Sequence, residues 1–327
     1  MPKESRNTMA YEEVIHLIDR HQYIGIITHI MPDGDTLGSA LALGAALKGM
    51  GKRVSVFNQD GVPAKYKFLV ENGDIGVYTK HQDCTLVITV DCSDIDRLGD
   101  SFTQLFKNAQ DTVNIDHHKS NNMYADINIV ETDCGATGEI VYKLIKQLPV
   151  GINKYMAECL YVALSTDTGS FSYSNTTSQT FAIASNLAKH EINIGRISRE
   201  LFYKRSLDKT KLIGIAIDNI TLYFENRVAI VYIENASIAH LSVDEEDFDG
   251  LINYAREIEG VEVAVLIRNK GDSIKIGLRS NTYVDVSAIA QKFGGGGHER
   301  AAGCIVEGTD VKGTIKPLLA EIAAHLD

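Results

Sequence analysis

The sequence lacks any apolar run long enough to cross a membrane. Its most apolar stretch, residues 37–47, contains two glycines and ends just before Lys48, whereas a transmembrane helix needs about 20 consecutive apolar residues. The N-terminal stretch is polar and carries charges of both signs, which is not the pattern of a signal peptide. We therefore expect a cytoplasmic protein that has no membrane partner.

The sequence is also poor in cysteine. Its five cysteines are an odd number, and no two of them are spaced as CxxC. This pattern argues against a disulfide framework and against a zinc knuckle. We expect the thiols to serve as small hydrophobic side chains in a reducing compartment.

Basic charge is scarce as well. The 32 Lys and Arg residues stand against 43 Asp and Glu residues, which gives a formal net charge of −11. Tight binding of long nucleic acid depends on many Lys and Arg contacts with phosphates, so we expect no long nucleic acid as a partner. Carboxylates that hold divalent cations would account for part of the acidity.

The 327 residues are enough for two domains, and the first half has the pattern of an α/β fold. Short apolar runs alternate with helical patterns, which predicts a parallel sheet covered by helices on both faces. Strands are predicted over residues 23–30, 53–58, 85–91, 112–118 and 126–130, and helices over 36–50 and 136–148.

The pattern changes after about residue 150. The stretch 153–217 looks wholly helical, and its later part, 186–217, mixes charges with weak apolar periodicity, which favours a connector. Beyond it the chain predicts two β-hairpins and three helices, the pattern of a second, α+β domain. The hairpins cover 220–235 and 261–280, and the helices cover 244–258, 285–292 and 312–326.

Acidic and histidine side chains follow three of the predicted strands in the first half. In an open parallel sheet, the ligand crevice lies outside the carboxyl ends of the strands, so these side chains should gather in one region. A further acidic residue ends an apolar helical pattern. The residues are His29, Asp33, Asp35, Asp91, Asp116, His117, His118 and, at the end of the helix, Asp167.

Carboxylate and imidazole groups without thiolate favour Mn²⁺ and similar cations over a zinc finger or a calcium loop. Asp33 and Asp35 flank Gly34 and could serve different ions, and Asp91 could bridge the two ions. Two ions about 3.5–4 Å apart can activate a water and neutralise a phosphoryl group. Each feature taken singly also fits a turn, a helix cap or a polar strand end, but their occurrence at successive strand ends favours a two-metal centre.

A glycine-rich motif marks the second half. Four glycines, residues 294–297, precede His298, and the small residues that follow predict the start of a helix. Glycines let backbone N–H groups approach an anion, and a helix N-terminus also favours phosphate. Upstream, Arg279 could make a forked contact with a terminal phosphate. The alternative is a flexible hinge, which does not need a histidine beside it.

These motifs together resemble those of the DHH phosphoesterase superfamily. The pattern His29-x-x-x-Asp33-x-Asp35, then Asp91, then Asp116-His117-His118, then Asp167 is similar to its four motifs. The run from Gly294 to His298, followed by Ala301-Ala302-Gly303, resembles the GGGH motif of its DHHA1 domain. The resemblance covers nearly the whole chain, and the order and length are similar to those of the NrnA-type oligoribonucleases.

The resemblance implies a Rossmann-like DHH domain over residues 1–185, a helical linker over 186–217 and a DHHA1 domain over 218–327, with the active site between the domains. It implies two Mn²⁺ ions, or other divalent metals, bound by His29, Asp33, Asp35, Asp91, His117 and Asp167. His118 would contact the scissile phosphate, and Asp116 would orient the neighbouring imidazoles. Substrate phosphate would be held by Arg279, Gly296, Gly297 and His298.

The implied activity is hydrolysis of short oligoribonucleotides to 5′-mononucleotides, with a second activity on the nucleoside bisphosphate 3′-phosphoadenosine 5′-phosphate. One alternative is an enzyme specialised for linear dinucleotides such as pApA, which arise from cyclic dinucleotide turnover. Others are a hydrolase of inorganic polyphosphate and a non-catalytic nucleotide sensor. A homodimer is compatible with the sequence, which does not define the oligomeric state.

Overall fold

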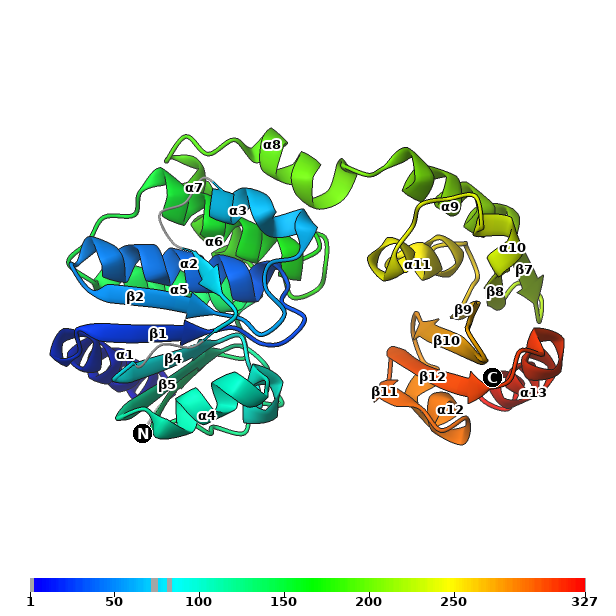
Figure 1. The fold of residues 1–327 in the computed structure, drawn as a ribbon, viewed down its shortest axis with the longest axis horizontal. Coiled ribbons are helices and arrows are strands. Elements are labelled where there is room, and N and C mark those ends of the chain that lie inside the picture. Colours follow the sequence, from blue (N-terminus) through cyan, green and yellow to red (C-terminus); the bar gives the residue numbers. More distant parts are fainter. Residues whose placement is uncertain (1–2, 72–75, 81–83, 327) are drawn as a thin grey trace. The chain divides into compact units, whose positions relative to one another are not determined.

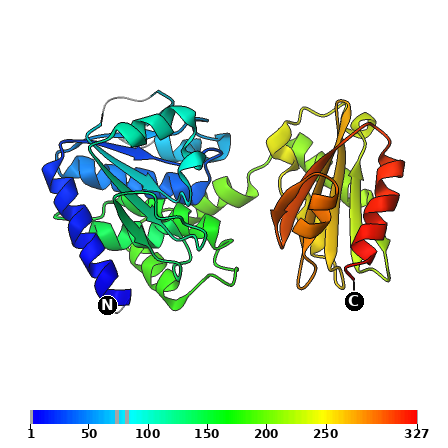
Figure 2. The same cartoon turned by 90° about the horizontal axis from the view of Figure 1, so that it is seen from below.

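The computed structural model describes residues 3–71, 76–80 and 84–326. The chain divides into two compact units, Met1–Lys204 and Arg205–Asp327 (Figures 1 and 2). Within the described residues, no helix combines the length and the apolar character that a membrane span requires. The expected fold class, a parallel-sheet α/β domain followed by a smaller α+β domain, is confirmed.

The first unit is built on a six-stranded parallel sheet in the order β3-β2-β1-β4-β5-β6. Alternate residues of its central strands enter different cores. Ile26 and Ile88 join one hydrophobic cluster, whereas Ile27 and Val87 join another on the opposite face, as expected for continuous apolar runs. The strands are β1 (Tyr23–Ile27), β2 (Arg53–Phe57), β3 (Val77–Tyr78), β4 (Leu86–Val90), β5 (Asp111–Asp116) and β6 (Ile127–Val130).

Helices cover this sheet, and the most buried of them is α2. A Cβ at Gly38 of α2 would lie 2.3 Å from the carbonyl oxygen of Cys159 in α6, so only glycine permits this close contact between the two helices. The α-helices of the unit are α1 (Lys3–Arg20), α2 (Gly34–Gly49), α3 (Lys67–Glu71), α4 (Asp100–Asn108), α5 (Thr137–Gln147), α6 (Lys154–Asp167), α7 (Ser178–Ala188) and α8 (Ile194–Ser198). Short helical turns are η1 (Ala64–Tyr66), η2 (Ile95–Leu98) and η3 (Arg199–Tyr203).

The second unit has a six-stranded sheet in the order β11-β12-β10-β9-β8-β7, in which only β8 and β9 are parallel neighbours. One face packs against α12 and α13, and the other packs against α9 and α11. The strands are β7 (Ile220–Tyr223), β8 (Val228–Ile233), β9 (Val263–Lys270), β10 (Ser273–Ser280), β11 (Gly296–His298) and β12 (Ala301–Glu307). The helices are α9 (Leu207–Asp218), α10 (Asn235–Ile238), η4 (Glu245–Phe248), α11 (Leu251–Arg256), α12 (Val286–Lys292) and α13 (Val311–Ala323).

Both predicted hairpins are present, as the antiparallel pairs β7–β8 and β9–β10. The helix predicted after the glycine run is wrong, because residues 301–307 form β12, which pairs with β10 on one side and β11 on the other. The stretch 186–217 is predicted as a linker. It contributes Ile197 and Leu201 to the core of the first unit, and Leu212 to the core that α9 and α11 form on the sheet of the second unit. Its boundaries as a linker stay a prediction.

Candidate metal centre

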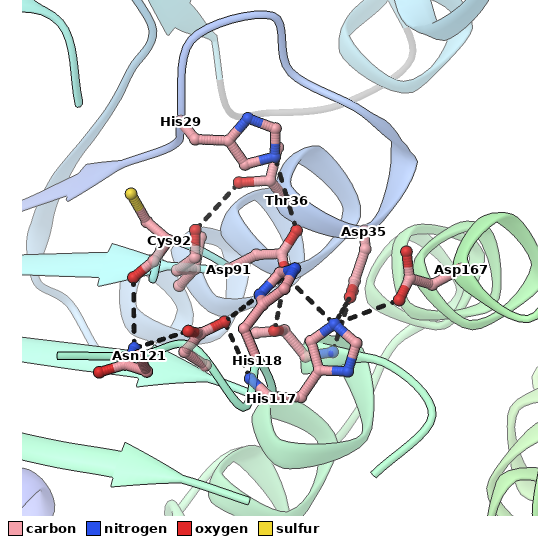
Figure 3. Close-up of polar contacts among 12 residues, drawn as sticks. His29, Asp35, Thr36, Asp91, Cys92, His117, His118, Asn121 and Asp167 are labelled. Carbon is pink, nitrogen blue, oxygen red and sulfur yellow. Dashed lines mark hydrogen bonds and ion pairs between the residues drawn. The ribbon is translucent and has the colours of Figure 1, made fainter. Parts of the chain in front are cut away.

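Side chains from several elements meet at the carboxyl edge of the first sheet (Figure 3). His29 follows β1, Asp33 and Asp35 lie at the start of α2, and Asp91 follows β4. Asp116 is the last residue of β5, His117 and His118 follow it, and Asp167 is the last residue of α6. The structure thus brings together all eight residues that the sequence pattern selected in this half of the chain. Those residues are His29, Asp33, Asp35, Asp91, Asp116, His117, His118 and Asp167, and their roles as ligands or catalytic groups stay predictions.

Within the described residues, three overlapping groups of three side chains have the dimensions of a cation site. In each group the candidate ligand atoms lie within 4.8 Å of one another. All of these atoms are carboxylate oxygens or imidazole nitrogens, which suit hard and borderline divalent cations. The groups are His29–Asp33–Asp91, Asp35–His117–Asp167 and Asp91–His117–His118.

The carboxylate of Asp91 lies between the first two groups. Its Oδ2 is 3.6 Å from Nε2 of His29, and its Oδ1 is 3.6 Å from Nε2 of His117. Burial raises the pKa of Asp91, against the lowering effect of His29. A carboxylate that presents one oxygen to each group has the geometry of a bridging ligand.

The backbone at Asp91 is held in an unusual conformation. Its φ of 57° lies in the left-handed region, which costs a side-chain-bearing residue of the order of 1–3 kcal/mol. The Asp91 N–H donates to the carbonyl of Ile115 at 2.9 Å. The next carbonyl, of Cys92, accepts from Asn114 Nδ2 at 3.0 Å and from the Tyr124 hydroxyl at 3.1 Å. These bonds fix the turn that orients the Asp91 side chain toward the cluster. The sequence pattern does not identify Asn114 or Tyr124.

Asp35 is fixed by the N-terminus of α5. Its Oδ2 accepts from the Thr137 N–H at 2.6 Å, and its Oδ1 accepts from the Gly138 N–H at 2.9 Å and from the Ser39 hydroxyl at 3.1 Å. The carboxylate is fully buried, and burial, followed by the charge of Asp91, raises its pKa well above the usual range. The buried carboxylates of Asp35 and Asp91 repel each other unless a cation or a proton offsets their charge.

Two imidazoles are oriented by backbone carbonyls. Nδ1 of His29 is 2.7 Å from the Ile30 oxygen, and Nδ1 of His117 is 3.2 Å from the Cys134 oxygen. Because a carbonyl can only accept, Nδ1 carries the proton in both rings, and Nε2 faces the carboxylates. Burial lowers the pKa of each ring, but the carboxylates outweigh it. Contacts with Asp33 and Asp91 raise the pKa of His29 to about 10, and those with Asp167, Asp35 and Asp91 raise the pKa of His117 to about 10.

His117 supplies the most direct test of whether the cluster fits a metal ion. Its Nε2 is buried and has no hydrogen-bond partner, although carboxylate oxygens of Asp167, Asp91 and Asp35 lie 3.2, 3.6 and 3.9 Å away. A buried polar atom without a partner is costly. A cation among these oxygens would satisfy the lone pair and neutralise the carboxylates, so the residues present fit a metal.

His118 differs from the other two histidines because its ring is 37% exposed. Its Nδ1 donates to Oδ1 of Asp116 at 2.7 Å, and this bond is the main cause that raises the pKa of His118. Asp116 is fully buried, and its Oδ2 accepts from Asn121 Nδ2 at 2.6 Å. Asn121, which the sequence pattern did not select, therefore holds the carboxylate that holds His118.

In the second unit, the structure places Arg279 and His298 in one row. Arg279 of β10 pairs with Ala301 of β12, which pairs on its other side with His298 of β11. Directly opposed residues point to the same face of a sheet, so the two basic groups share a face with only a methyl side chain between them. Two strand spacings separate their Cα atoms by about 10 Å.

The glycines before His298 have different structural roles. Gly297 has a φ of 147°, and a Cβ there would lie 2.5 Å from the Ala301 carbonyl oxygen. It is therefore needed for the pairing of β11 with β12. Gly296 is exposed, and a Cβ there would meet nothing within 4 Å. The proposed contacts of Gly296 and Gly297 with substrate stay predictions.

A parallel-sheet unit with this His/Asp cluster, joined to a second sheet unit with a glycine–histidine motif, defines a class of two-domain phosphoesterases. The model of the "DHH family, N-terminal domain" matches residues 23–164, and that of the "DHHA1 domain" matches residues 210–325. The chain belongs to the DHH/DHHA1 phosphoesterases, which confirms the family that the motifs predict.

Individual proteins resemble the chain over nearly its full length. A bifunctional oligoribonuclease and PAP phosphatase, NrnA, from Thermus thermophilus is 28% identical over 96% of this chain and 93% of its own length. The crystal structure of an exopolyphosphatase-related protein from Bacteroides fragilis aligns with a TM-score of 0.89 and 25% identity, over 97% of this chain and 96% of that one. Exonuclease RecJ bound to manganese shares the fold, with a TM-score of 0.51 and 14% identity over 96% of this chain and 94% of that chain.

Proposed function

We propose that the chain is a Mn²⁺-dependent hydrolase that cuts short oligoribonucleotides to 5′-mononucleotides and also removes the 3′-phosphate of 3′-phosphoadenosine 5′-phosphate. One observation carries the metal-dependent part: the Asp91 carboxylate lies between two groups of three ligands, with one oxygen 3.6 Å from His29 and the other 3.6 Å from His117. The resemblance to NrnA supports the choice of substrates.

Six residues would hold the metal pair. When bound, two ions supply an activated water and neutralise the phosphoryl group as its ester bond breaks. Asp91 would contact both ions, and the buried Nε2 of His117 would gain the partner it lacks. The ligand set would be His29, Asp33 and Asp91 in one group and Asp35, His117 and Asp167 in the other, with Asp91 also 3.6 Å from His117.

The remaining groups of the cluster act on the substrate. His118 is the exposed imidazole, so its Nε2 can donate to an oxygen of the scissile phosphate. Asp116 holds the Nδ1 proton of that ring at 2.7 Å, which fixes its orientation and favours its charged form. In the second unit, Arg279 and His298 offer two donors on one face for a substrate phosphate.

Product analysis with Mn²⁺ tests this proposal. The substrates are pApA, a five-unit RNA, a twenty-unit RNA and 3′-phosphoadenosine 5′-phosphate, with inorganic polyphosphate as a fifth arm. We expect AMP from pApA and from the bisphosphate, mononucleotides from the five-unit RNA, and little product from the long RNA. Cleavage of pApA alone would indicate a dinucleotide enzyme, cleavage of polyphosphate alone would move the protein to another substrate class, and no hydrolysis would favour a sensor.

A further inference from the structure

The row that holds Arg279 and His298 borders a strip of bare backbone. Along the same face, the next row is formed by Gly277 of β10, Gly303 of β12 and Gly296 of β11, which pair directly with one another. None of the three has a side chain, so no side chain of these strands rises above the sheet here. A Cβ at Gly277 would lie 3.9 Å from Ile252 of α11, whereas one at Gly296 would meet nothing within 4 Å. Gly277 and Gly303 are half-buried, and Gly296 is exposed.

A second basic row lies beyond the glycines on the same face. Lys275 of β10 pairs with Arg268 of β9, and Lys275 is four residues, or about 13 Å, along the strand from Arg279. A chain of phosphates that reaches Arg279 along the glycine strip would meet Lys275 and Arg268 next. The face therefore carries two separate positions for anions.

The second position is occupied by an acidic side chain of the protein itself. Glu245 accepts from Lys275 Nζ at 2.6 Å and from Arg268 Nη2, and Lys270 Nζ lies 3.9 Å away. The contact with Lys275 is the main cause that lowers the pKa of Glu245 to about 2, so the carboxylate is charged at neutral pH. Three cations around one half-exposed carboxylate resemble the way a protein holds a phosphate.

The segment that carries Glu245 is strongly acidic, and it contacts both β9 and α9. Residues 244–249 contain five carboxylates and Phe248, whose ring lies 4.1 Å from the Arg268 guanidinium. Asp247 lies 3.7 Å from Lys209 of α9. The backbone forms the short turn η4, closed by reciprocal hydrogen bonds between Asp244 and Asp247.

We propose that Glu245 is a length-selecting residue: it occupies the Arg268–Lys275 anion position as a phosphate substitute, and thereby withholds that position from oligonucleotides long enough to extend past Arg279. The proposal rests on the proposed function, because it assumes that an RNA phosphate binds at Arg279 and His298. A dinucleotide that contacts only that first row does not meet Glu245. A longer strand must displace the Glu245 carboxylate.

The test is RNA binding by the full chain in EDTA, where the RNA is not cut, read by fluorescence anisotropy with labelled pApA and a labelled twelve-unit RNA. Glu245→Gln should bind the long RNA about tenfold more tightly at low salt and leave pApA unchanged. In this variant Arg268 and Lys275 become available to RNA phosphates. These two contacts should steepen the slope of log affinity against log salt by about 1.4, at about 0.7 for each phosphate contact of a single strand. Glu246→Gln, which removes the same charge from the exposed neighbouring residue, should change neither.

Equal gains for Glu245→Gln and Glu246→Gln, equal gains for both RNAs, or no gain would overturn the proposal. Should Glu245→Gln fail to fold by circular dichroism, Lys275→Gln supplies the second test. In the wild type, Lys275 is already paired with Glu245 and is not available to RNA. Lys275→Gln should therefore bind the long RNA within about twofold of the wild type, and a tenfold loss would contradict the proposal. Failure of the proposed function would appear differently, as a wild-type chain that hydrolyses none of the substrates with Mn²⁺ present.

Discussion

Nδ1 of His118 donates a 2.7 Å hydrogen bond to the fully buried carboxylate of Asp116. The bond ties the exposed imidazole to a group that is itself held by Asn121. Among the described histidines of the cluster, His118 is the one whose Nδ1 partner carries a negative charge, whereas the Nδ1 atoms of His29 and His117 face neutral backbone carbonyls. The two arrangements fit the proposal that His118 acts on substrate and that His29 and His117 hold metal.

Asp116→Asn tests this distinction. The substitution keeps the shape of the side chain but removes the charge that orients His118 and raises its pKa. We expect kcat to fall about 10- to 100-fold, as is usual when the carboxylate behind a functional histidine is lost, while Mn²⁺ affinity changes little. Steady-state kinetics and metal titration measure the two quantities, and a loss of metal affinity with unchanged kcat would assign Asp116 to the metal site instead.

Asp91→Asn should have opposite effects on stability without metal and on catalysis with Mn²⁺. Asn tolerates the left-handed φ of 57°, so the backbone should survive. Burial raises the pKa of Asp91, and a carboxyl with a raised folded pKa opposes folding at pH values where it is ionised. In EDTA at pH 8, calorimetry should therefore show an equal or higher Tm for the variant, and kcat with Mn²⁺ should fall at least about 1,000-fold. A lower Tm without metal would contradict this assignment of buried repulsion.

Substitution by alanine should have opposite effects at two helix glycines, one in the contact between α2 and α6 and one at an open position of α9. Gly38→Ala would place a Cβ 2.3 Å from the Cys159 carbonyl oxygen, whereas Gly214→Ala in α9 meets nothing within 4 Å. We expect Gly38→Ala to reduce the free energy of unfolding by about 1–3 kcal/mol or more, as overpacking does, and Gly214→Ala to increase it by about 0.5–1 kcal/mol. Urea unfolding followed by circular dichroism measures both changes. Equal effects of the two substitutions would show that α2 and α6 are less closely packed than described.

Glu262 in the second unit should make stability depend on pH. Its carboxylate accepts from the Thr282 hydroxyl and from the backbone N–H groups of Thr282, Tyr283 and Val284. Burial alone would raise its pKa, but these bonds lower it. A lowered folded pKa stabilises the protein above the ordinary glutamate pKa of about 4.3, and that contribution is lost as pH falls below it.

Glu262→Gln should therefore lower the stability of the second unit by about 1–2 kcal/mol at pH 7 and flatten its decline between about pH 5 and pH 3. Urea unfolding at several pH values measures both effects. Glu259→Gln, at an exposed position close by, is the matched control and should change neither quantity. A decline with pH that is as steep in Glu262→Gln as in the wild type would exclude Glu262 as its source.

The sequence predicted most of the first unit because its signals are local and repeated. Continuous apolar runs such as residues 85–91 indicate strands buried on both faces, and parallel order places Asp91 and His117 at one edge without further information. Asn114, Asn121 and Tyr124 were missed because they bond to the Cys92 carbonyl or to Asp116 across loops, and no periodicity or spacing marks such contacts. The small residues of 301–307 predict the start of a helix, whereas pairing with β10 and β11 makes the region a strand.

The contact of Glu245 with Lys275 shows the same limit. The two residues are 30 positions apart in the sequence, and their acidic and basic neighbourhoods are ordinary as local composition. Only the register of β9 with β10 places Arg268 and Lys275 side by side beneath an acidic turn. Tertiary pairing of charges therefore has to be read from the structure.

The most direct measurement is anomalous diffraction at the manganese edge from crystals of the full chain grown with Mn²⁺. We expect two peaks about 3.5–4 Å apart, one beside His29 and Asp33 and one beside Asp35, His117 and Asp167, with the Asp91 carboxylate between them. A single peak, or two peaks of which neither lies against Asp91, would contradict a metal pair bridged by that residue.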